Sequence, residues 1–162
     1  MSRLTIPINV VIFSLFIVSA AGQSPEENKK IVTRYLLDIF NGKKLELLGE
    51  VFPEKFVRHD LNDGTDTWMT VADQRKRLSN LFRAFPDFYY TIGDIMAEGD
   101  KVVVRALWHG TQKDSFMGVE SLGNSIDSVT EIIFYRLDKG KIVERWTQLD
   151  LWTLIKKMKG EE

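Results

Sequence analysis

The sequence contains no cysteine, only two histidines, and no long run of basic residues. Without cysteine the chain can form neither a disulfide framework nor a thiolate metal site. The two histidines, His59 and His109, are 50 positions apart, which makes a poor metal site. The formal net charge of −1 gives no electrostatic reason for binding nucleic acid. We therefore expect no metal and no nucleic-acid partner.

The motifs of several other chemistries are also missing. There is no Gly-rich phosphate loop, no G-x-S-x-G nucleophile elbow and no basic-aromatic platform for single strands. What is present is an ordinary globular composition, with 44% hydrophobic and 28% charged residues in a chain of 162. That length suits one domain with a real core. Aromatic residues make up 11%, which fits either an aromatic-lined cavity or an aromatic core.

The first 22 residues differ from the rest of the chain. Arg3 precedes an uncharged apolar run over residues 8–18, and small residues follow at 19–22. This order is typical of a secretory signal peptide, and the run is short for a membrane span of about 20 residues. We predict a signal peptide over 1–22, a single domain over 23–162, and a secreted or periplasmic protein with no stable membrane span after cleavage. The alternative is an uncleaved N-terminal membrane anchor.

Helical signals dominate the first half of the mature chain. Ser24, followed by Pro25 and Glu27, is typical of a capping box, and Gly42 ends the apolar periodicity that follows. Two further helical patterns end before prolines. Residues 56–59 look briefly extended, and 60–67 form a polar loop. Helices are therefore predicted over residues 25–41, 45–52 and 70–84.

The period then changes from helical to extended. Two pairs of strands flank turn signals at residues 98–100 and 138–140, with a polar connection over 112–125 between the pairs. A short helix follows, with Asp150 as its expected N-cap. Helices followed by hairpins predict an α+β domain with helices packed on one face of an antiparallel sheet. The predicted strands cover residues 88–97, 101–111, 126–137 and 141–151, and the terminal helix covers 152–159.

Four motifs occur in order in the second half: F-P-D at 85–87, E-G-D-K-V-V-V-R at 98–105, G-T-Q-K-D-S-F-M-G at 110–118, and K-G-K-I-V-E-R-W-T-Q-L-D at 139–150. Together they resemble the SnoaL-like polyketide cyclase (ester cyclase) family of the nuclear transport factor 2-like superfamily, over nearly all of residues 25–159. The resemblance implies an α+β cone, in which a strongly curved antiparallel sheet packs on three N-terminal helices.

The resemblance also implies an activity, which is ring closure of an ester-bearing polyketide by an intramolecular aldol step. An acid in a hydrophobic cone moves the proton there, without metal or organic cofactor. In this sequence the family's acid after tryptophan falls on Thr147, the histidine before tryptophan on Arg145, and the histidine of its G-T-H on Gln112. The site of the cyclases is therefore not reproduced residue for residue.

Strand alternation predicts which side chains face the interior of the cone. If Thr147 faces inward in an unbroken strand, Val143, Arg145 and Leu149 share its face. On the neighbouring strand the inward residues are then Glu131, Ile133 and Tyr135. Glu131 is a candidate acid-base catalyst, with Arg145 as a clamp for an anion or a carbonyl oxygen. The alternative is a structural ion pair between these two residues.

A second catalytic candidate is His59, which with Asp60 matches the D-H-D of the family near the cavity mouth. A histidine near its ordinary pKa is a natural base at neutral pH. The predicted substrate-binding residues are Arg145, Thr147, Tyr135, Trp68, Trp108 and Trp146. For each aromatic residue, packing in the core is the alternative interpretation.

Two functions follow from these predictions. The first is proton transfer on a small apolar carbonyl compound by an exported cyclase-type enzyme that uses Glu131 or His59. The second is a non-catalytic module of the same fold that binds or carries a small molecule. Epoxide hydrolysis or isomerisation is a third option, and a homodimer formed through the sheet is a further expectation.

Overall fold

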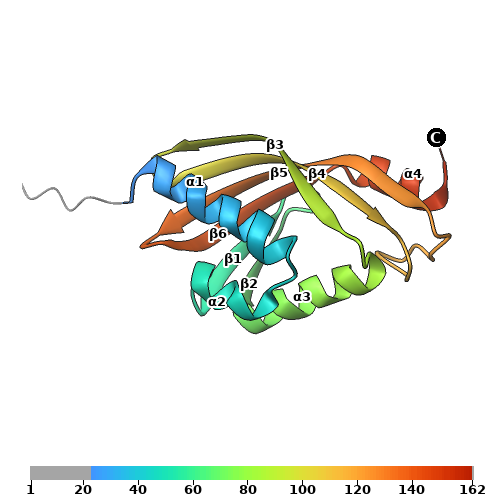
Figure 1. The fold of residues 1–162 in the computed structure, drawn as a ribbon, viewed down its shortest axis with the longest axis horizontal. Helices are drawn as coiled ribbons and strands as arrows, with labels where there is room; N and C mark the ends of the chain where they lie inside the picture. Colours follow the sequence, from blue (N-terminus) through green and yellow to red (C-terminus); the bar gives the residue numbers. More distant parts are fainter. Residues whose placement is uncertain (1–22, 162) are drawn as a thin grey trace, which may run out of the picture.

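A computed structural model describes residues 23–161, which form a curved six-stranded sheet and four α-helices (Figure 1). The α+β fold predicted from the sequence is thereby confirmed. The predicted signal peptide, residues 1–22, lies outside the described residues. Among the helices of residues 23–161, none is long and apolar enough to cross a bilayer.

The elements follow one another in the order that the sequence patterns predict, with one addition. Their bounds are α1 Pro25–Arg34, the π-helical η1 Tyr35–Phe40, the 3-10 turn η2 Leu45–Leu47, α2 Leu48–Val51, β1 Lys55–Asp60, β2 Thr65–Thr70, α3 Val71–Ala84, β3 Tyr89–Glu98, β4 Lys101–Thr111, β5 Ser125–Asp138, β6 Lys141–Leu149 and α4 Leu151–Lys159.

Helix starts are set by side-chain caps, as predicted. Ser24 accepts a hydrogen bond from the backbone N–H of Glu27, whose carboxylate accepts one from the N–H of Ser24 in return. Thr70 and Asp73 form the same reciprocal pair at the start of α3. Asp150 caps α4 by accepting from the N–H of Thr153 at 3.0 Å, so its predicted role as an N-cap is confirmed.

The strand order in the sheet is β2-β1-β6-β5-β4-β3. The β1/β6 pair is parallel, and the other pairs among the described strands are antiparallel. Strand β2 is the addition: the prediction of a loop up to residue 67 was wrong. Its sequence T-D-T-W-M-T buries only Met69, so it lacks the apolar alternation of a core strand and is held by pairing with β1.

The sheet curves because three strands carry bulges. The register shifts at Gly93 in β3, at Ser128 in β5 and at Val143 in β6, each of which has no partner across the ladder. A bulge bends its strand and increases the local twist. The bulge at Val143 also corrects the predicted parity, because Ile142, rather than Val143, is buried on the inner face. Arg145, Thr147 and Leu149 face inward as predicted.

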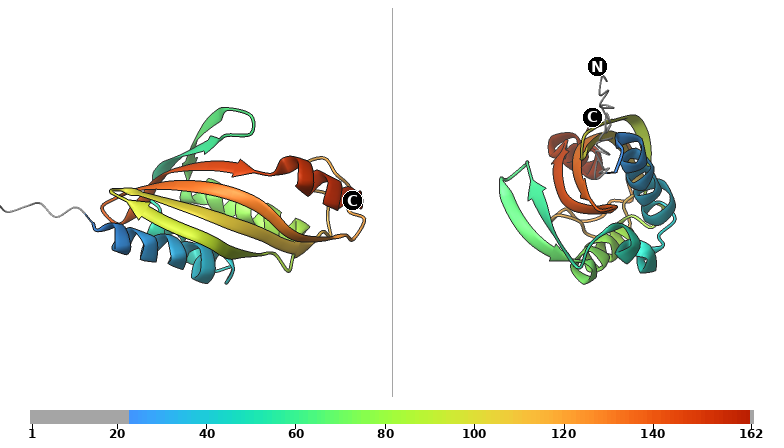
Figure 2. Two further views of the ribbon diagram at one scale, coloured as in Figure 1. Left: turned by 90° about the horizontal axis from the view of Figure 1, so that it is seen from above. Right: turned by 90° about the vertical axis from the view of Figure 1, so that its left-hand side faces the viewer.

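The helices α1 and α3 lie on the concave side of this sheet, as the end-on view in Figure 2 shows. The first helical segment packs along β3 and β4, and α3 runs beneath the sheet from the end of β2 (Figure 1). Between these layers lies one continuous apolar core. Its largest fully buried side chains are aromatic, and they include Tyr35, Phe40, Phe52, Phe56, Phe85, Phe88 and Tyr135.

Asn41 ties the end of η1 to the start of β3. Its Nδ2 donates to the carbonyl of Tyr90 at 2.8 Å, and its Oδ1 accepts from the N–H of Tyr90 at 2.8 Å. Strand β3 is at the edge of the sheet. The side-chain amide of Asn41 therefore takes the place of a neighbouring strand, because it pairs with both the N–H and the carbonyl of Tyr90. This contact fixes the backbone of Tyr90, whose hydroxyl reaches the interior.

We expect Asn41→Ala to lower the free energy of unfolding by about 1–3 kcal/mol, since two partly buried backbone groups lose their partner. Urea denaturation of the mature domain measures this loss. The matched control is Asn80→Ala on the exposed face of α3, which should change stability by less than about 0.5 kcal/mol. Equal small effects of both substitutions would show that the Asn41 contact does not hold β3.

Candidate functional site

A cavity of about 160 Å³ lies between the inner face of the sheet, α3 and the connection between β4 and β5. It is the place where charged side chains of the described chain become buried. Apolar side chains from α3, β6, α4 and the connection complete its wall. The lining residues are Arg58, Asp60, Asn62, Arg77, Leu81, Tyr90, Trp108, Phe116, Met117, Glu131, Arg145, Thr147, Leu149 and Leu151.

Glu131, on β5, is at the centre of the polar part of the cavity and is 2% exposed. Its Oε2 accepts hydrogen bonds from the Tyr90 hydroxyl and, at 2.7 Å, from Trp108 Nε1. Its Oε1 accepts from Arg145 Nη2 at 2.9 Å. A carboxylate oxygen can accept two hydrogen bonds, so Oε1 keeps one acceptor position open.

Arg145 and Thr147 are adjacent inward residues of β6 and are 3% and 4% exposed. Burial alone lowers the pKa of the Arg145 guanidinium, but the neighbouring Tyr135 and Glu131 outweigh it and hold the pKa above its ordinary value. The guanidinium is therefore charged. Its Nε and Nη1 have no hydrogen-bond partner, nor does Thr147 Oγ1. Buried donors without hydrogen-bond partners destabilise a protein. Such donors are expected at a place where a bound ligand supplies the acceptors.

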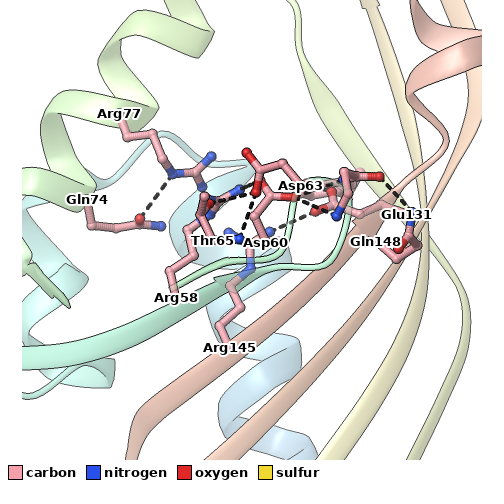
Figure 3. A network of polar contacts seen from close by, with 11 residues as sticks. Arg58, Asp60, Asp63, Thr65, Gln74, Arg77, Glu131, Arg145 and Gln148 are labelled. Atoms are coloured by element: carbon pink, nitrogen blue, oxygen red, sulfur yellow. Dashed lines mark hydrogen bonds and ion pairs between the residues drawn. The ribbon is translucent and has the colours of Figure 1, made fainter. Parts of the chain in front are cut away.

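A second ion pair lies on β1, where Arg58 Nη2 contacts Asp60 Oδ2 at 2.6 Å. Burial raises the pKa of the Asp60 carboxyl, but hydrogen bonds from Asn62 and Arg58 outweigh it, and the pKa lies below its usual range. Arg77, on α3, donates from Nε to Gln74 Oε1 at 3.2 Å. Figure 3 shows Gln74 and Arg77 on the helix, and Arg58, Asp60, Arg145 and Glu131 on the strands.

The structure brings together four of the residues that the sequence predicted for the site: Glu131, Arg145, Thr147 and Trp108. Tyr135 is also fully buried, but it lies one layer away among the core aromatics, where its ring packs edge-on against Tyr35. It does not line the cavity.

Three further predicted residues, besides Tyr135, are not brought to this cavity. His59 and Trp146 lie on the opposite face of the sheet, where their rings stack at 4.6 Å and the His59 Nδ1 contacts Asp66 at 2.6 Å. The cause is strand parity, because His59 pairs with Trp146 while its neighbours Arg58 and Asp60 pair with the inward Arg145 and Thr147. Trp68 on β2 is 73% exposed.

Sequence reasoning did not assign five polar residues of the cavity to the site, namely Arg58, Asp60, Asn62, Arg77 and Tyr90. Alternation on β1 could have separated Asp60 from His59 if the parallel pairing with β6 had been anticipated. Asp60 aligns with Thr147 in that pairing, so a carboxylate stands one strand away from the position where the family has its acid. Arg77 lies three residues after Gln74 and four before Leu81, so the helical period that buries these two residues could have distinguished it from Arg75 and Lys76.

A larger groove of about 610 Å³ lies on the outer side of the sheet, near the start of α4. It is open, and the residues that line it include no buried charged side chain. Among residues 23–161 no group of three or more histidine, aspartate or glutamate side chains is arranged to hold a metal ion. The enclosed cavity around Glu131 is therefore the candidate site.

We expect Arg145→Met to destabilise the domain by about 3–5 kcal/mol, since it leaves the Glu131 carboxylate buried without its cation. The double substitution Glu131→Gln/Arg145→Met should cost less than the sum of the two single substitutions, by about 1 kcal/mol or more. Chemical denaturation of the four proteins measures this coupling. The control cycle uses the pair Arg136 and Glu144, which is more exposed, with an expected coupling below about 1 kcal/mol. Strict additivity at Glu131 and Arg145 would contradict the contact.

Comparison with known proteins agrees with this architecture. A protein from Acidithiobacillus ferrooxidans named a candidate polyketide cyclase is 25% identical, with a TM-score of 0.74 over 84% of this chain and 96% of that one. IdmH from Streptomyces antibioticus, also named a candidate polyketide cyclase, is 27% identical, with a TM-score of 0.70 over 82% and 98% of the two chains.

The same fold also carries another named activity. AclR from Streptomyces galilaeus, named a candidate hydroxylase, is 25% identical, with a TM-score of 0.71 over 86% of this chain and 100% of that one. No curated protein gives a significant match. The family model for SnoaL-like polyketide cyclase matches residues 30–158. The chain therefore belongs to the SnoaL-like polyketide cyclase family.

Proposed function

We propose that this protein binds a small carbonyl compound in the cavity and carries out cofactor-independent proton transfer of the cyclase type, with Glu131 as the acid-base group. The observation that carries the proposal is the buried contact between Glu131 Oε1 and Arg145 Nη2, at 2.9 Å, within a cavity. It supports an active site because both partners keep unused hydrogen-bonding capacity.

Removal of a proton next to a carbonyl needs two groups at once. A base must reach the carbon-bound hydrogen, and a donor must hold the oxygen on which negative charge develops. Glu131 Oε1 has an open acceptor position, and Arg145 has unpartnered donors at Nε and Nη1. A carbonyl oxygen at those nitrogens would bring its α-carbon toward the carboxylate.

The proposed reaction balances without a cofactor. The α-hydrogen moves as a proton to Glu131 Oε1, and the carbon–hydrogen electron pair forms an enolate whose oxygen is held by Arg145. The enolate carbon then forms a carbon–carbon bond with a second carbonyl carbon of the same molecule. The oxygen of that second carbonyl takes the proton back from Glu131. The apolar wall, including Leu81 and Phe116, favours the folded ligand that this ring closure needs.

Tyr90 and Trp108 orient the catalytic carboxylate in this proposal. Burial, reinforced by the negative charge of Glu131, raises the pKa of the Tyr90 hydroxyl well above its ordinary value. The phenol therefore stays protonated and donates to Glu131 Oε2, as the Trp108 indole does. With Oε2 engaged twice, the proton is directed to Oε1.

A second candidate function is non-catalytic binding of the same class of compound. The observation in its favour is Thr147, which lies where the family has its acid and whose Oγ1 has no partner to activate it. In that case Arg145 only binds the carbonyl oxygen, and Glu131 holds Arg145 in place. Export of the protein and a homodimer through the sheet stay predictions under either function.

The proposal is tested by the exchange of α-hydrogens in deuterated water, followed by proton NMR. The substrates are a panel of aryl ketones and keto esters, with β-benzoylpropionate among them. We expect the protein to accelerate exchange in at least one compound and Glu131→Gln to lower that rate about 10²–10⁴-fold, since the amide cannot accept the proton.

Glu144→Gln is the matched control, because it makes the same change on the outer face of the sheet, where Glu144 pairs with Arg136. It should exchange at the wild-type rate. Binding of a panel compound without any exchange above the Glu131→Gln level would contradict proton transfer and favour the binding module.

A further inference from the structure

We propose that the ligand of this cavity carries, besides the ketone held by Arg145, a carboxylate bound by Arg77 together with the unpartnered Nε of Arg58. The inference rests on the proposed function only in placing the ligand in the same cavity. It names the substrate class as a small apolar keto acid in its anionic form. A neutral ester, which the family resemblance implies, is expected to bind less well.

The charges that line the cavity do not balance. Arg58 is paired with Asp60 at 2.6 Å, and Arg145 with Glu131 at 2.9 Å. Arg77 is the third guanidinium of the lining, and none of the ion pairs found in residues 23–161 includes it. Its hydrogen bond goes to the neutral amide oxygen of Gln74. The cavity therefore holds one positive charge in excess, and a carboxylate would neutralise it.

Unpartnered donors point to the same ligand. Three guanidinium nitrogens in the cavity are buried and have no hydrogen-bond partner: Nε and Nη1 of Arg145, and Nε of Arg58. Water does not satisfy the Arg145 donors, because that side chain is only 3% exposed. A carboxylate offers two oxygens with about four acceptor positions, and guanidinium groups bind it with paired, charge-assisted hydrogen bonds. A single ketone oxygen could satisfy only part of this set.

The arginines also act on one another. The pKa of Arg77 lies below its ordinary value, first because of burial and then because of the positive charge of Arg145, with a smaller contribution from Arg58. Arg77 lines the same cavity as Arg145 and Arg58, and their positive charges act against its own. A bound anion would remove that repulsion, whereas a neutral ligand would leave it in place.

The remaining wall limits the rest of the ligand. Leu81, Phe116, Leu149 and Leu151 are apolar, so the body of the molecule is expected to be apolar too. The Arg77 guanidinium comes from α3, and the Glu131–Arg145 pair comes from the sheet (Figure 3). A ligand that spans them has its carboxylate toward the helix and its ketone toward the sheet.

The test compares an acid with its own ester. Calorimetry at one fixed salt concentration measures the Kd of β-benzoylpropionate and of methyl β-benzoylpropionate, with benzoate and phenylacetate as shorter acids. We expect the wild-type protein to bind β-benzoylpropionate about tenfold or more tightly than the methyl ester, as befits hydrogen bonds to a charged group. Arg77→Met should abolish this preference, and Arg77→Lys should keep part of it.

Arg136→Met is the matched control, since it removes a guanidinium from the outer face of the sheet, where Arg136 pairs with Glu144. It should leave the preference unchanged. The inference is overturned if the ester binds as tightly as the acid, if none of the three acids binds at millimolar concentration, or if Arg77→Met, shown to be folded by circular dichroism, keeps the full preference.

The two proposals fail in different ways. A preference for the acid without any α-hydrogen exchange would contradict proton transfer and leave the carboxylate site intact. Exchange that depends on Glu131 but proceeds equally well with the ester would contradict the carboxylate site and leave proton transfer intact.

Discussion

The rest of this structure depends on one buried ion pair, Glu131 with Arg145, which joins β5 to β6 inside the curved sheet. Two charges out of water are tolerated only when hydrogen bonds complete their surroundings. For Glu131 this is done by Tyr90 and Trp108 from the next two strands. For Arg145 it is done only in part, because two of its nitrogens have no partner. The incomplete half of the pair is where a ligand is needed.

Curvature of the sheet produces this arrangement. Bulges at Gly93, Ser128 and Val143 bend three of the strands, so side chains from β1, β3, β4, β5 and β6 converge on one small volume that α3 closes. The parallel β1/β6 pair adds Arg58 and Asp60 to the same volume. A flat sheet would spread these groups over its surface, where each would be solvated and of little chemical use.

Much of the fold could be predicted from the sequence because caps, turns and periodicity are local signals, as the confirmed roles of Ser24 and Asp150 show. The inward placement of Glu131 and Arg145 could be predicted as well, since alternation holds from residue 145 to residue 149. His59 shows the limit of this reasoning. Its orientation depends on a parallel pairing between residues almost 90 positions apart, which no local pattern encodes. Strand β2 was missed for a different reason: it pairs with the adjacent β1, but only Met69 among its residues is buried, so it lacks the apolar alternation of a core strand.

The most direct measurement is a crystal structure of Glu131→Gln soaked with β-benzoylpropionate. The account predicts the ketone oxygen at about 3 Å from Arg145 Nε or Nη1, and the α-carbon facing residue 131. A ligand bound only in the open groove near α4, with the cavity between Arg145 and α3 left empty, would contradict it.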